Sequence, residues 1–155
     1  MKAREIKEIL ISYLTADNPQ IRIYAEKSIG SSICDLMAVT DKLIGFEIKS
    51  DADNYSRLNS QIKAYEKFFN LIYIVVGESH VNSAYEKVPA NWGIIKIRTD
   101  GVTVLRQARN NNGIDLETQL SVLWQIELKN ILIKHGMPLY SQKSKQYSYA
   151  NCKLS

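Results

Sequence analysis

The chain has 155 residues and a mass of 17.7 kDa, with 45% hydrophobic residues, 23% charged residues and a formal net charge of +4. This length suffices for a hydrophobic core, and this composition excludes wholesale disorder, collagen-like and coiled-coil structure. The longest apolar stretch, residues 71–76, is too short to cross a membrane, and the charged N-terminus lacks a secretory signal. Two cysteines without a Cys-x-x-Cys pair argue against a disulfide framework or a zinc site. We therefore expect a soluble, cytoplasmic protein with no membrane partner.

The positive charge is concentrated at the C-terminal end of the chain. Residues 1–127 contain 15 basic and 16 acidic residues, whereas residues 128–155 contain five lysines and no acid. We expect a single domain over residues 1–139 and a basic tail over residues 140–155. Lys143 and Lys145 lie among tyrosines in this tail and are candidate nucleic-acid contacts, and the alternative is a frayed, solvated end.

Hydrophobic periodicity predicts a mixture of helices and strands. Helical spacing of apolar residues predicts helices over residues 3–14, 55–69 and 81–87 and a long closing helix from Leu116 to about Gly136. Alternating or β-branched runs predict strands over residues 21–26, 33–39, 43–49, 71–77, 92–97 and 101–106. This order predicts an α/β fold in which helices flank a mixed sheet that contains an antiparallel hairpin.

The predicted hairpin over residues 33–49 carries the chemical signal. In its second strand Gly45, Glu47 and Lys49 share one face, because side chains alternate along a strand. The glycine leaves room beside the carboxylate and the ammonium. In the first strand Asp35 interrupts an otherwise apolar run.

The register of this hairpin decides whether the charged residues meet. A three-residue loop over residues 40–42 places Asp35 directly opposite Glu47, with their Cβ atoms roughly 5 Å apart on one face. A two-residue loop would send Asp35 to the other face. The odd loop is favoured because it aligns apolar residues across the strands, pairing Leu36 with Phe46 and Cys34 with Ile48.

Two carboxylates at this distance repel each other unless a cation lies between them. Mg²⁺ takes carboxylate oxygens and completes its shell with waters and substrate phosphates, and Lys49 on the same face can neutralise developing charge. Asp35, Glu47 and Lys49 therefore predict a metal-assisted phosphodiesterase site. The spacing alone is not specific, because Glu-x-Lys recurs at 5–7 and 127–129, and an exposed Glu/Lys ladder on a sheet is the alternative.

The surrounding sequence resembles a known family. The run GFEIKSDADNYSRLNSQIKAYEKFFNLIYIVVGESH, continued by VPANWGIIKI, is similar to an uncharacterised bacterial and phage family of the PD-(D/E)XK, or restriction-endonuclease-like, nuclease superfamily. The resemblance covers roughly residues 20–97. It implies an αβββαβ core, which agrees with the predicted element order, and an active site made of Asp35, Glu47 and Lys49. Cys34 stands where the superfamily motif has its nominal proline.

The resemblance also implies a metal site. Asp35, Glu47 and the backbone carbonyl of Ile48 would bind Mg²⁺ or Mn²⁺. Glu26 matches an additional acid that many superfamily members place upstream. Since Glu26 is predicted to lie on a strand, Glu5 and Glu8 on the first helix are competing candidates.

Three residues of the second predicted helix complete the site that the resemblance implies. Gln61 and Tyr65 match the Gln-x-x-x-Tyr motif of RecB-like nucleases and share one helical face. Gln61 would orient the catalytic residues, and Arg57 and Tyr65 would contact nucleic acid. For Tyr65 the alternative is a core tyrosine, and for Arg57 it is a solvated helix residue.

The resulting expectation is a metal-dependent (endo)deoxyribonuclease that hydrolyses DNA, with RNA as an alternative substrate, in repair, recombination or a phage or defence context. The small size favours a homodimer or a partner protein that supplies target recognition. Two alternatives remain open. One is a catalytically inactive module that binds nucleic acid or protein, and the other is a nuclease subunit that is active only in a larger complex.

Overall fold

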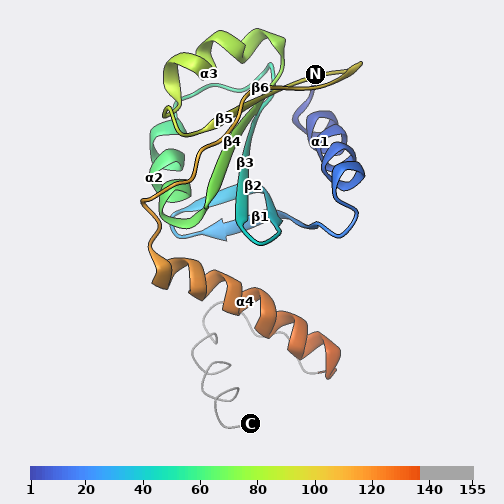
Figure 1. Ribbon diagram of the computed structural model, residues 1–155, viewed down its shortest axis with the longest axis vertical. Helices are drawn as coiled ribbons and strands as arrows, with labels where there is room; N and C mark the ends of the chain where they lie inside the picture. The colour runs from blue at the N-terminus through green and yellow to red at the C-terminus, as the bar shows by residue number, and fades with distance from the viewer. Residues whose placement is uncertain (137–155) are drawn as a thin grey trace. The chain divides into compact units, whose positions relative to one another are not determined.

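The computed structural model describes residues 1–136 (Figure 1). The chain divides into two compact units, Met1–Leu116 and a second that begins at Glu117, a boundary that lies within the single domain expected over residues 1–139. The helices and strands are α1 (Ala3–Asp17), β1 (Arg22–Ile29), β2 (Ser32–Val39), β3 (Leu43–Lys49), α2 (Leu58–Phe68), β4 (Leu71–Val76), the 3-10 turn η1 (Glu78–His80), α3 (Val81–Lys87), β5 (Gly93–Arg98), β6 (Gly101–Arg106) and α4 (Leu116–Lys134). The predicted tail over residues 140–155 lies outside the described residues.

The strands of the first unit form one sheet in the order β1-β2-β3-β4-β5-β6. β1, β2 and β3 are antiparallel neighbours, β3, β4 and β5 are parallel neighbours, and β6 returns antiparallel to β5. Parallel neighbours require a crossover, which α2 provides between β3 and β4 and α3 provides between β4 and β5. The expected α/β fold, a mixed sheet flanked by helices, is confirmed (Figure 1).

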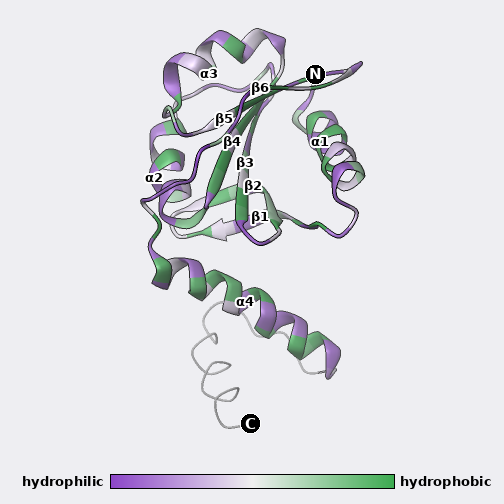
Figure 2. Cartoon of the chain, viewed as in Figure 1, coloured by the Kyte–Doolittle hydropathy of each residue, from purple (hydrophilic) through white to green (hydrophobic). Residues whose placement is uncertain are grey.

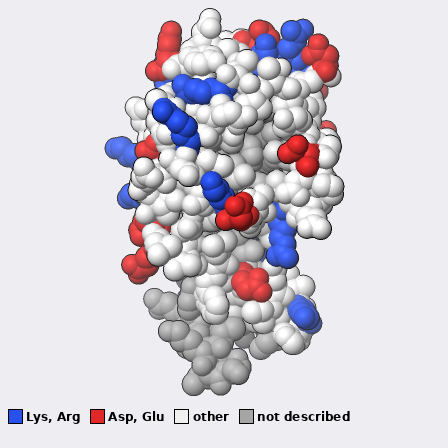
Figure 3. Space-filling model, viewed as in Figure 1, with Lys and Arg blue, Asp and Glu red and all other residues white. Residues whose placement is uncertain are grey.

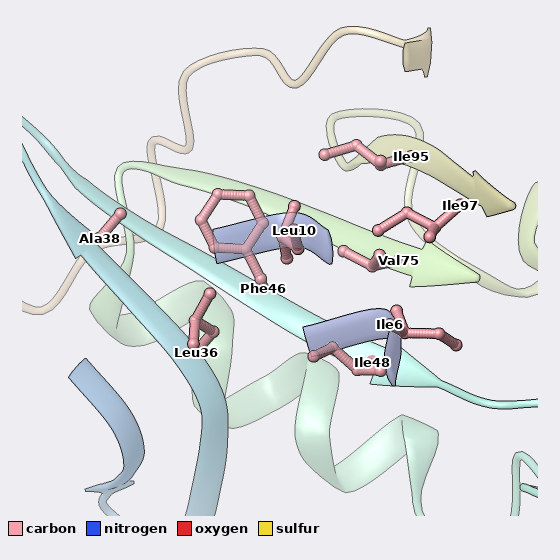
Figure 4. Packing of buried hydrophobic residues seen from close by; sticks show 9 residues of the cluster. All are labelled: Ile6, Leu10, Leu36, Ala38, Phe46, Ile48, Val75, Ile95 and Ile97. Carbon is pink, nitrogen blue, oxygen red and sulfur yellow. The ribbon is translucent and has the colours of Figure 1, made fainter. Parts of the chain in front are cut away.

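One face of the sheet packs against α1. Ile6 and Leu10 lie one turn apart, so their side chains share a face of the helix. Together with side chains from β2, β3, β4 and β5 they form a buried cluster (Figure 4), which consists of Ile6, Leu10, Leu36, Ala38, Phe46, Ile48, Val75, Ile95 and Ile97. Because Phe46 and Ile48 point into this cluster, alternation along β3 directs Glu47 to the opposite face.

The opposite face of the sheet packs against α2 and the residue that follows it. Tyr65 and Phe69 are fully buried, with ring centroids 5.2 Å apart, and the ring of Trp92 lies 5.6 Å from that of Tyr65. A Cβ atom at Gly45 would lie 2.4 Å from the Phe69 ring. The room left by this glycine is therefore filled by Phe69. The strands between the two helical layers are largely hydrophobic (Figure 2).

The second helix begins later than the sequence predicts, at Leu58 instead of residue 55. The preceding loop is held by short polar side chains. Asp53 Oδ2 accepts hydrogen bonds from the backbone N and Oγ of Ser50, and Asn54 Oδ1 accepts the corresponding pair from Ser56. Such local bonds satisfy backbone donors outside a helix and compete with helix formation.

The described part of the second unit is α4, which agrees with the predicted closing helix. Large apolar side chains on this helix are exposed at Leu116, Leu120, Trp124 and Ile133. Within residues 1–136 no helix combines the length and the apolar character needed to span a membrane. On the molecular face in Figure 3, acidic and basic side chains are interspersed, which fits the near balance of charge over residues 1–127.

Substitution of Gly45 tests the packing behind β3. The added methyl group of Gly45→Ala must displace the buried Phe69 ring, so we expect the free energy of unfolding to fall by about 1–3 kcal/mol in chemical denaturation. Ile33→Ala on β2 is the control, because the Ile33 side chain is 59% exposed, and its expected change is below about 0.5 kcal/mol. An unchanged free energy for Gly45→Ala would contradict the close approach of Phe69.

Candidate active site

Asp35 and Glu47 lie on the neighbouring strands β2 and β3. The paired residues are Val39–Leu43, Ala38–Ile44, Met37–Gly45 and Leu36–Phe46. This pairing confirms the expected register and the loop over residues 40–42, and it places Asp35 next to the last pair, across from Glu47. There Asp35 Oδ2 accepts a hydrogen bond of 2.8 Å from the backbone N–H of Ile48. The Asp35 side chain thus occupies the backbone N–H of Ile48, which a longer β2–β3 pairing would use.

The expected pair of Cys34 with Ile48 is absent from this ladder, because the Asp35 carboxylate occupies the Ile48 N–H. Cys34 is instead fully buried, and its thiol donates to the backbone carbonyl of Leu36. Burial raises the pKa of the Cys34 thiol to about 12. It is therefore a protonated core residue at neutral pH and no candidate nucleophile.

Glu47 is the centre of a buried polar network. Its Oε1 atom accepts hydrogen bonds from Lys49 Nζ at 2.8 Å and from Gln61 Nε2 at 2.6 Å. Gln61 Oε1 in turn accepts from Lys49 Nζ at 3.1 Å, so the three side chains form a closed ring. The Glu47 and Lys49 side chains are only 2% and 7% exposed. The structure therefore brings together the predicted glutamate, lysine and glutamine.

Tyr65 of α2 adds a further hydrogen bond to this network. Its hydroxyl donates to Glu47 Oε2 at 2.7 Å and accepts from the backbone N–H of Asp35 at 3.3 Å. Burial, followed by the nearby Cys34 and Glu47, raises the pKa of Tyr65 well above its usual range, so this hydroxyl stays protonated. The prediction that Tyr65 contacts nucleic acid is at odds with its burial, because the side chain is 0% exposed. The placement matches the alternative of a core tyrosine.

The Asp35 carboxylate lies in an environment that disfavours its negative charge. Burial, and next the charge of Glu47, raise the pKa of Asp35 from 3.8 to about 6. The Ile48 N–H and the charges of Lys49 and Lys7 act in the opposite direction but do not cancel these effects. None of the ion pairs found within residues 1–136 involves Asp35. This carboxylate would therefore gain most from an added cation.

The helix α2 explains why Gln61 and Tyr65 act on the same carboxylate. They lie one turn apart, so both side chains face Glu47. Arg57 lies one further turn towards the N-terminus, at the cap of the helix, and is exposed. Its contact with nucleic acid stays a prediction.

Glu26 lies on β1 in the row of Asp35, between the pairs Ala25–Leu36 and Lys27–Cys34. Its φ angle of 55° is left-handed, which is uncommon for a residue other than glycine. The exposed carboxylate pairs with Lys7 of α1 at 3.2 Å. The structure thus engages Glu26 with a lysine and not with Asp35 and Glu47.

The two competing acids on α1 are also engaged elsewhere. Glu5 accepts the backbone N–H of Lys2 at the start of the helix, and Glu8 pairs with Arg4. Lys7 pairs with Glu26, and its positive charge also acts to lower the pKa of Asp35, a role that the sequence does not predict. No periodicity or spacing marks it, because the contact with Glu26 joins two different elements, α1 and β1.

The donor set limits what metal could bind. Within residues 1–136 no group of three or more His, Cys, Asp or Glu side chains is arranged to hold a metal ion. Asp35 and Glu47 nevertheless form a two-carboxylate site, and Mg²⁺ is often held by one or two carboxylates with water and phosphate oxygens in the other positions. Burial and the charge of Glu47 raise the pKa of Asp35, and a cation between the two carboxylates would offset both effects. The residues present thus fit Mg²⁺ or Mn²⁺, and the roles of the Ile48 carbonyl and of Glu26 as ligands stay predictions.

The predicted contacts of Lys143 and Lys145 with nucleic acid fall outside the described residues. They stay predictions, as does the basic tail that contains them.

Asp35 makes the stability of the apo protein depend on pH. Its pKa is higher in the folded protein than in the unfolded chain, so the folded state binds the extra proton and stability falls as the pH rises from about 4 through about 6. Asp35→Asn keeps an acceptor for the Ile48 N–H and removes the ionisation. We expect this variant to unfold with a free energy higher than wild type by about 1–2 kcal/mol at pH 7.5 in chelator, and by much less at pH 4. A difference that does not grow with pH would contradict the proposed environment of Asp35.

Tyr65→Phe tests the hydroxyl that joins Glu47 to Asp35. The change removes one oxygen and leaves Glu47 Oε2 and the Asp35 N–H without this partner in a buried environment. We expect the free energy of unfolding to fall by about 1–3 kcal/mol. Tyr85→Phe is the control, because that tyrosine is 46% exposed and its change should lie within about 0.5 kcal/mol. Equal effects of the two substitutions would contradict the network.

Comparison with solved structures shows a shared fold. The SPO1766 protein of unknown function from Silicibacter pomeroyi superposes with a TM-score of 0.65 at 11% identity, over 91% of this chain and 99% of that chain. The structure of Pyrococcus furiosus SfsA in complex with Ca²⁺ gives a TM-score of 0.39 at 15% identity, over 72% of this chain and 64% of that chain, which is too low to argue a common fold.

Comparison of sequences leads to a phage protein. The chain is 26% identical to protein cII of Enterobacteria phage P4 over 107 residues, which are 66% of this chain and 40% of the phage protein. The chain thus spans less than half of the length of this relative. Neither the sequence comparison nor the structure comparison tests the resemblance to the nuclease superfamily, which stays a prediction. Because residues 1–155 match the family described as Bacteriophage P4 protein cII, the chain belongs to that family.

Proposed function

We propose that this protein is a metal-dependent nuclease that hydrolyses DNA phosphodiester bonds at Asp35, Glu47 and Lys49. The observation that supports this most is the placement of the partly buried Asp35 on β2 across from the buried Glu47–Lys49 pair of β3. The resemblance to PD-(D/E)XK nucleases assigns catalytic roles to the same three residues.

Asp35 and Glu47, with the Ile48 carbonyl, would hold Mg²⁺ or Mn²⁺. When bound, such a cation lowers the pKa of water and offsets charge on the phosphate. The ammonium of Lys49 donates to a phosphate oxygen and stabilises the charge that develops as water attacks phosphorus in line with the leaving oxygen. Gln61 fixes the side chains of Glu47 and Lys49 relative to each other, and Tyr65 holds the second oxygen of Glu47.

The energetics of the site favour a functional role over a structural one. A buried ion pair contributes little net stability compared with apolar side chains of similar size, because desolvation offsets its attraction. Burial, and next the repulsion from Glu47, raise the pKa of the second carboxylate, Asp35. A site that only stabilised the fold would have no physical reason to keep both acids.

A second candidate is a module that keeps this fold and binds nucleic acid or protein without catalysis. One observation favours it: within the described residues both oxygens of Glu47 are already hydrogen-bonded by the chain itself.

A third candidate is a nuclease subunit that is active only with a partner or as a homodimer. The phage P4 relative supports a phage context over repair or recombination in the host.

A nuclease assay with purified protein tests the proposal. In Mg²⁺ or Mn²⁺ we expect nicking or degradation of supercoiled, linear or single-stranded DNA, with RNA assayed in parallel, and loss of cleavage in EDTA. Asp35→Ala and Lys49→Ala should each reduce the rate by about 100-fold or more, because each removes a charged group from the reacting phosphate.

The chain contains its own control for this experiment. The string Glu127-Leu128-Lys129 on α4 repeats the Glu-x-Lys pattern of β3, but there the two side chains are exposed. Glu127→Ala and Lys129→Ala should cleave as wild type does. Cleavage retained by both Asp35→Ala and Lys49→Ala would contradict the mechanism. Metal binding without cleavage would favour the subunit, and DNA binding without metal binding would favour the inactive module.

A further inference from the structure

Lys49 is held by the site residues rather than pointing into free space. Its Nζ lies 2.8 Å from Glu47 Oε1 and donates to Gln61 Oε1 at 3.1 Å. The Gln61 amide closes the ring by donating its own N–H to the same Glu47 oxygen. With 7% of its side chain exposed, Lys49 has almost no access to bulk water.

The Glu47 carboxylate has little capacity left for another cation. Oε1 carries two lone pairs and already accepts from Lys49 and Gln61, while Oε2 accepts from Tyr65. A divalent ion on this carboxylate would lie close to the Lys49 ammonium. Repulsion between two cations is only weakly screened in such a buried place.

We propose that Lys49 is the resident counter-ion of Glu47, and that a divalent cation bound by Asp35 and Glu47 competes with the Lys49 ammonium for the Glu47 carboxylate. This inference rests on the proposed function, because it concerns the metal site assigned there. It adds an order of events: Lys49 stays paired with Glu47 in the apo protein and is released when the metal binds.

The geometry gives the released lysine a place to go. Gln61 Oε1 accepts from Lys49 independently of Glu47, so the ammonium can leave the carboxylate and keep one hydrogen bond. The Lys49 ammonium thus becomes available to a phosphate oxygen only after metal has bound. In the apo protein its charge is neutralised by Glu47, and the site attracts phosphate weakly.

Direct binding of Mn²⁺ tests the competition without any assay of cleavage. We expect Lys49→Met to bind Mn²⁺ about tenfold or more tightly than wild type in electron paramagnetic resonance titrations, since the competing charge is gone. Lys96→Met is the matched control. Lys96 also pairs with a glutamate, Glu78, at 3.3 Å and is 20% exposed, but it lies on β5. Its removal should leave Mn²⁺ affinity within about twofold of wild type.

A second measurement uses the wild-type chain and does not depend on the folding of a variant. With ¹⁵N-labelled lysine side chains, the Lys49 Nζ resonance is assigned by its loss in Lys49→Gln or Lys49→Arg. Saturating Mg²⁺ should shift this resonance and leave that of Lys96 in place.

The outcomes distinguish the competition, the metal site and the nuclease activity. Tighter Mn²⁺ binding by folded Lys49→Met together with the Mg²⁺-dependent shift supports the competition. The competition is overturned if Lys49→Met binds Mn²⁺ as tightly as the wild type or more weakly, or if saturating Mg²⁺ does not shift the Lys49 resonance. Neither result contradicts the nuclease proposal. Absence of Mn²⁺ binding to both wild type and variant overturns the metal site and the competition together. Confirmed competition without any nuclease activity overturns only the proposed function.

Discussion

The antiparallel register of β2 and β3 is the constraint on which the candidate site depends. Leu36 pairs with Phe46 in the cluster under α1, and this pairing fixes Asp35 and Glu47 on the other face. A slip by one residue would turn apolar side chains outward and separate the two carboxylates. The hydrophobic core on one side of the sheet thus sets the distance between the charged groups on the other.

The second layer, α2, converts this pair of acids into an organised network. Gln61 and Tyr65 reach Glu47 from one face of the helix, and the buried ring of Phe69 fixes the helix end against Gly45. The same burial that orders the side chains also raises the pKa of Asp35. The site therefore holds two acids and one lysine within a hydrogen-bonded network. Stability alone does not favour this excess of negative charge, whereas binding of a cation would compensate it.

The sequence predicts the fold well because its main signals are local. Apolar periodicity predicts the four α-helices and the strands of the sheet, although not the turn η1 or the start of α2, and the apolar pairing of Leu36 with Phe46 predicts the hairpin register. Shared helical spacing likewise places Gln61 and Tyr65 together. The function of these residues is a separate question, because neither the family membership nor the fold shared with the Silicibacter pomeroyi protein tests it.

Features that depend on long-range packing could not be predicted. Glu26 has the expected position in β1, but the pairing of β1 with β2 skips it, its backbone is left-handed, and its carboxylate pairs with Lys7 of α1. The room beside Gly45 is taken by Phe69, which is distant in sequence. For Tyr65 the spacing along the helix leaves two interpretations open, a nucleic-acid contact and a core tyrosine, and the structure buries the side chain.

A crystal structure of the wild-type protein soaked in Mn²⁺, recorded with anomalous scattering, tests the central claim most directly. We expect an anomalous peak between Asp35 and Glu47, about 2 Å from an oxygen of each carboxylate. The absence of a peak there in crystals saturated with Mn²⁺, with Asp35 and the Glu47–Lys49–Gln61 ring unchanged, would contradict it.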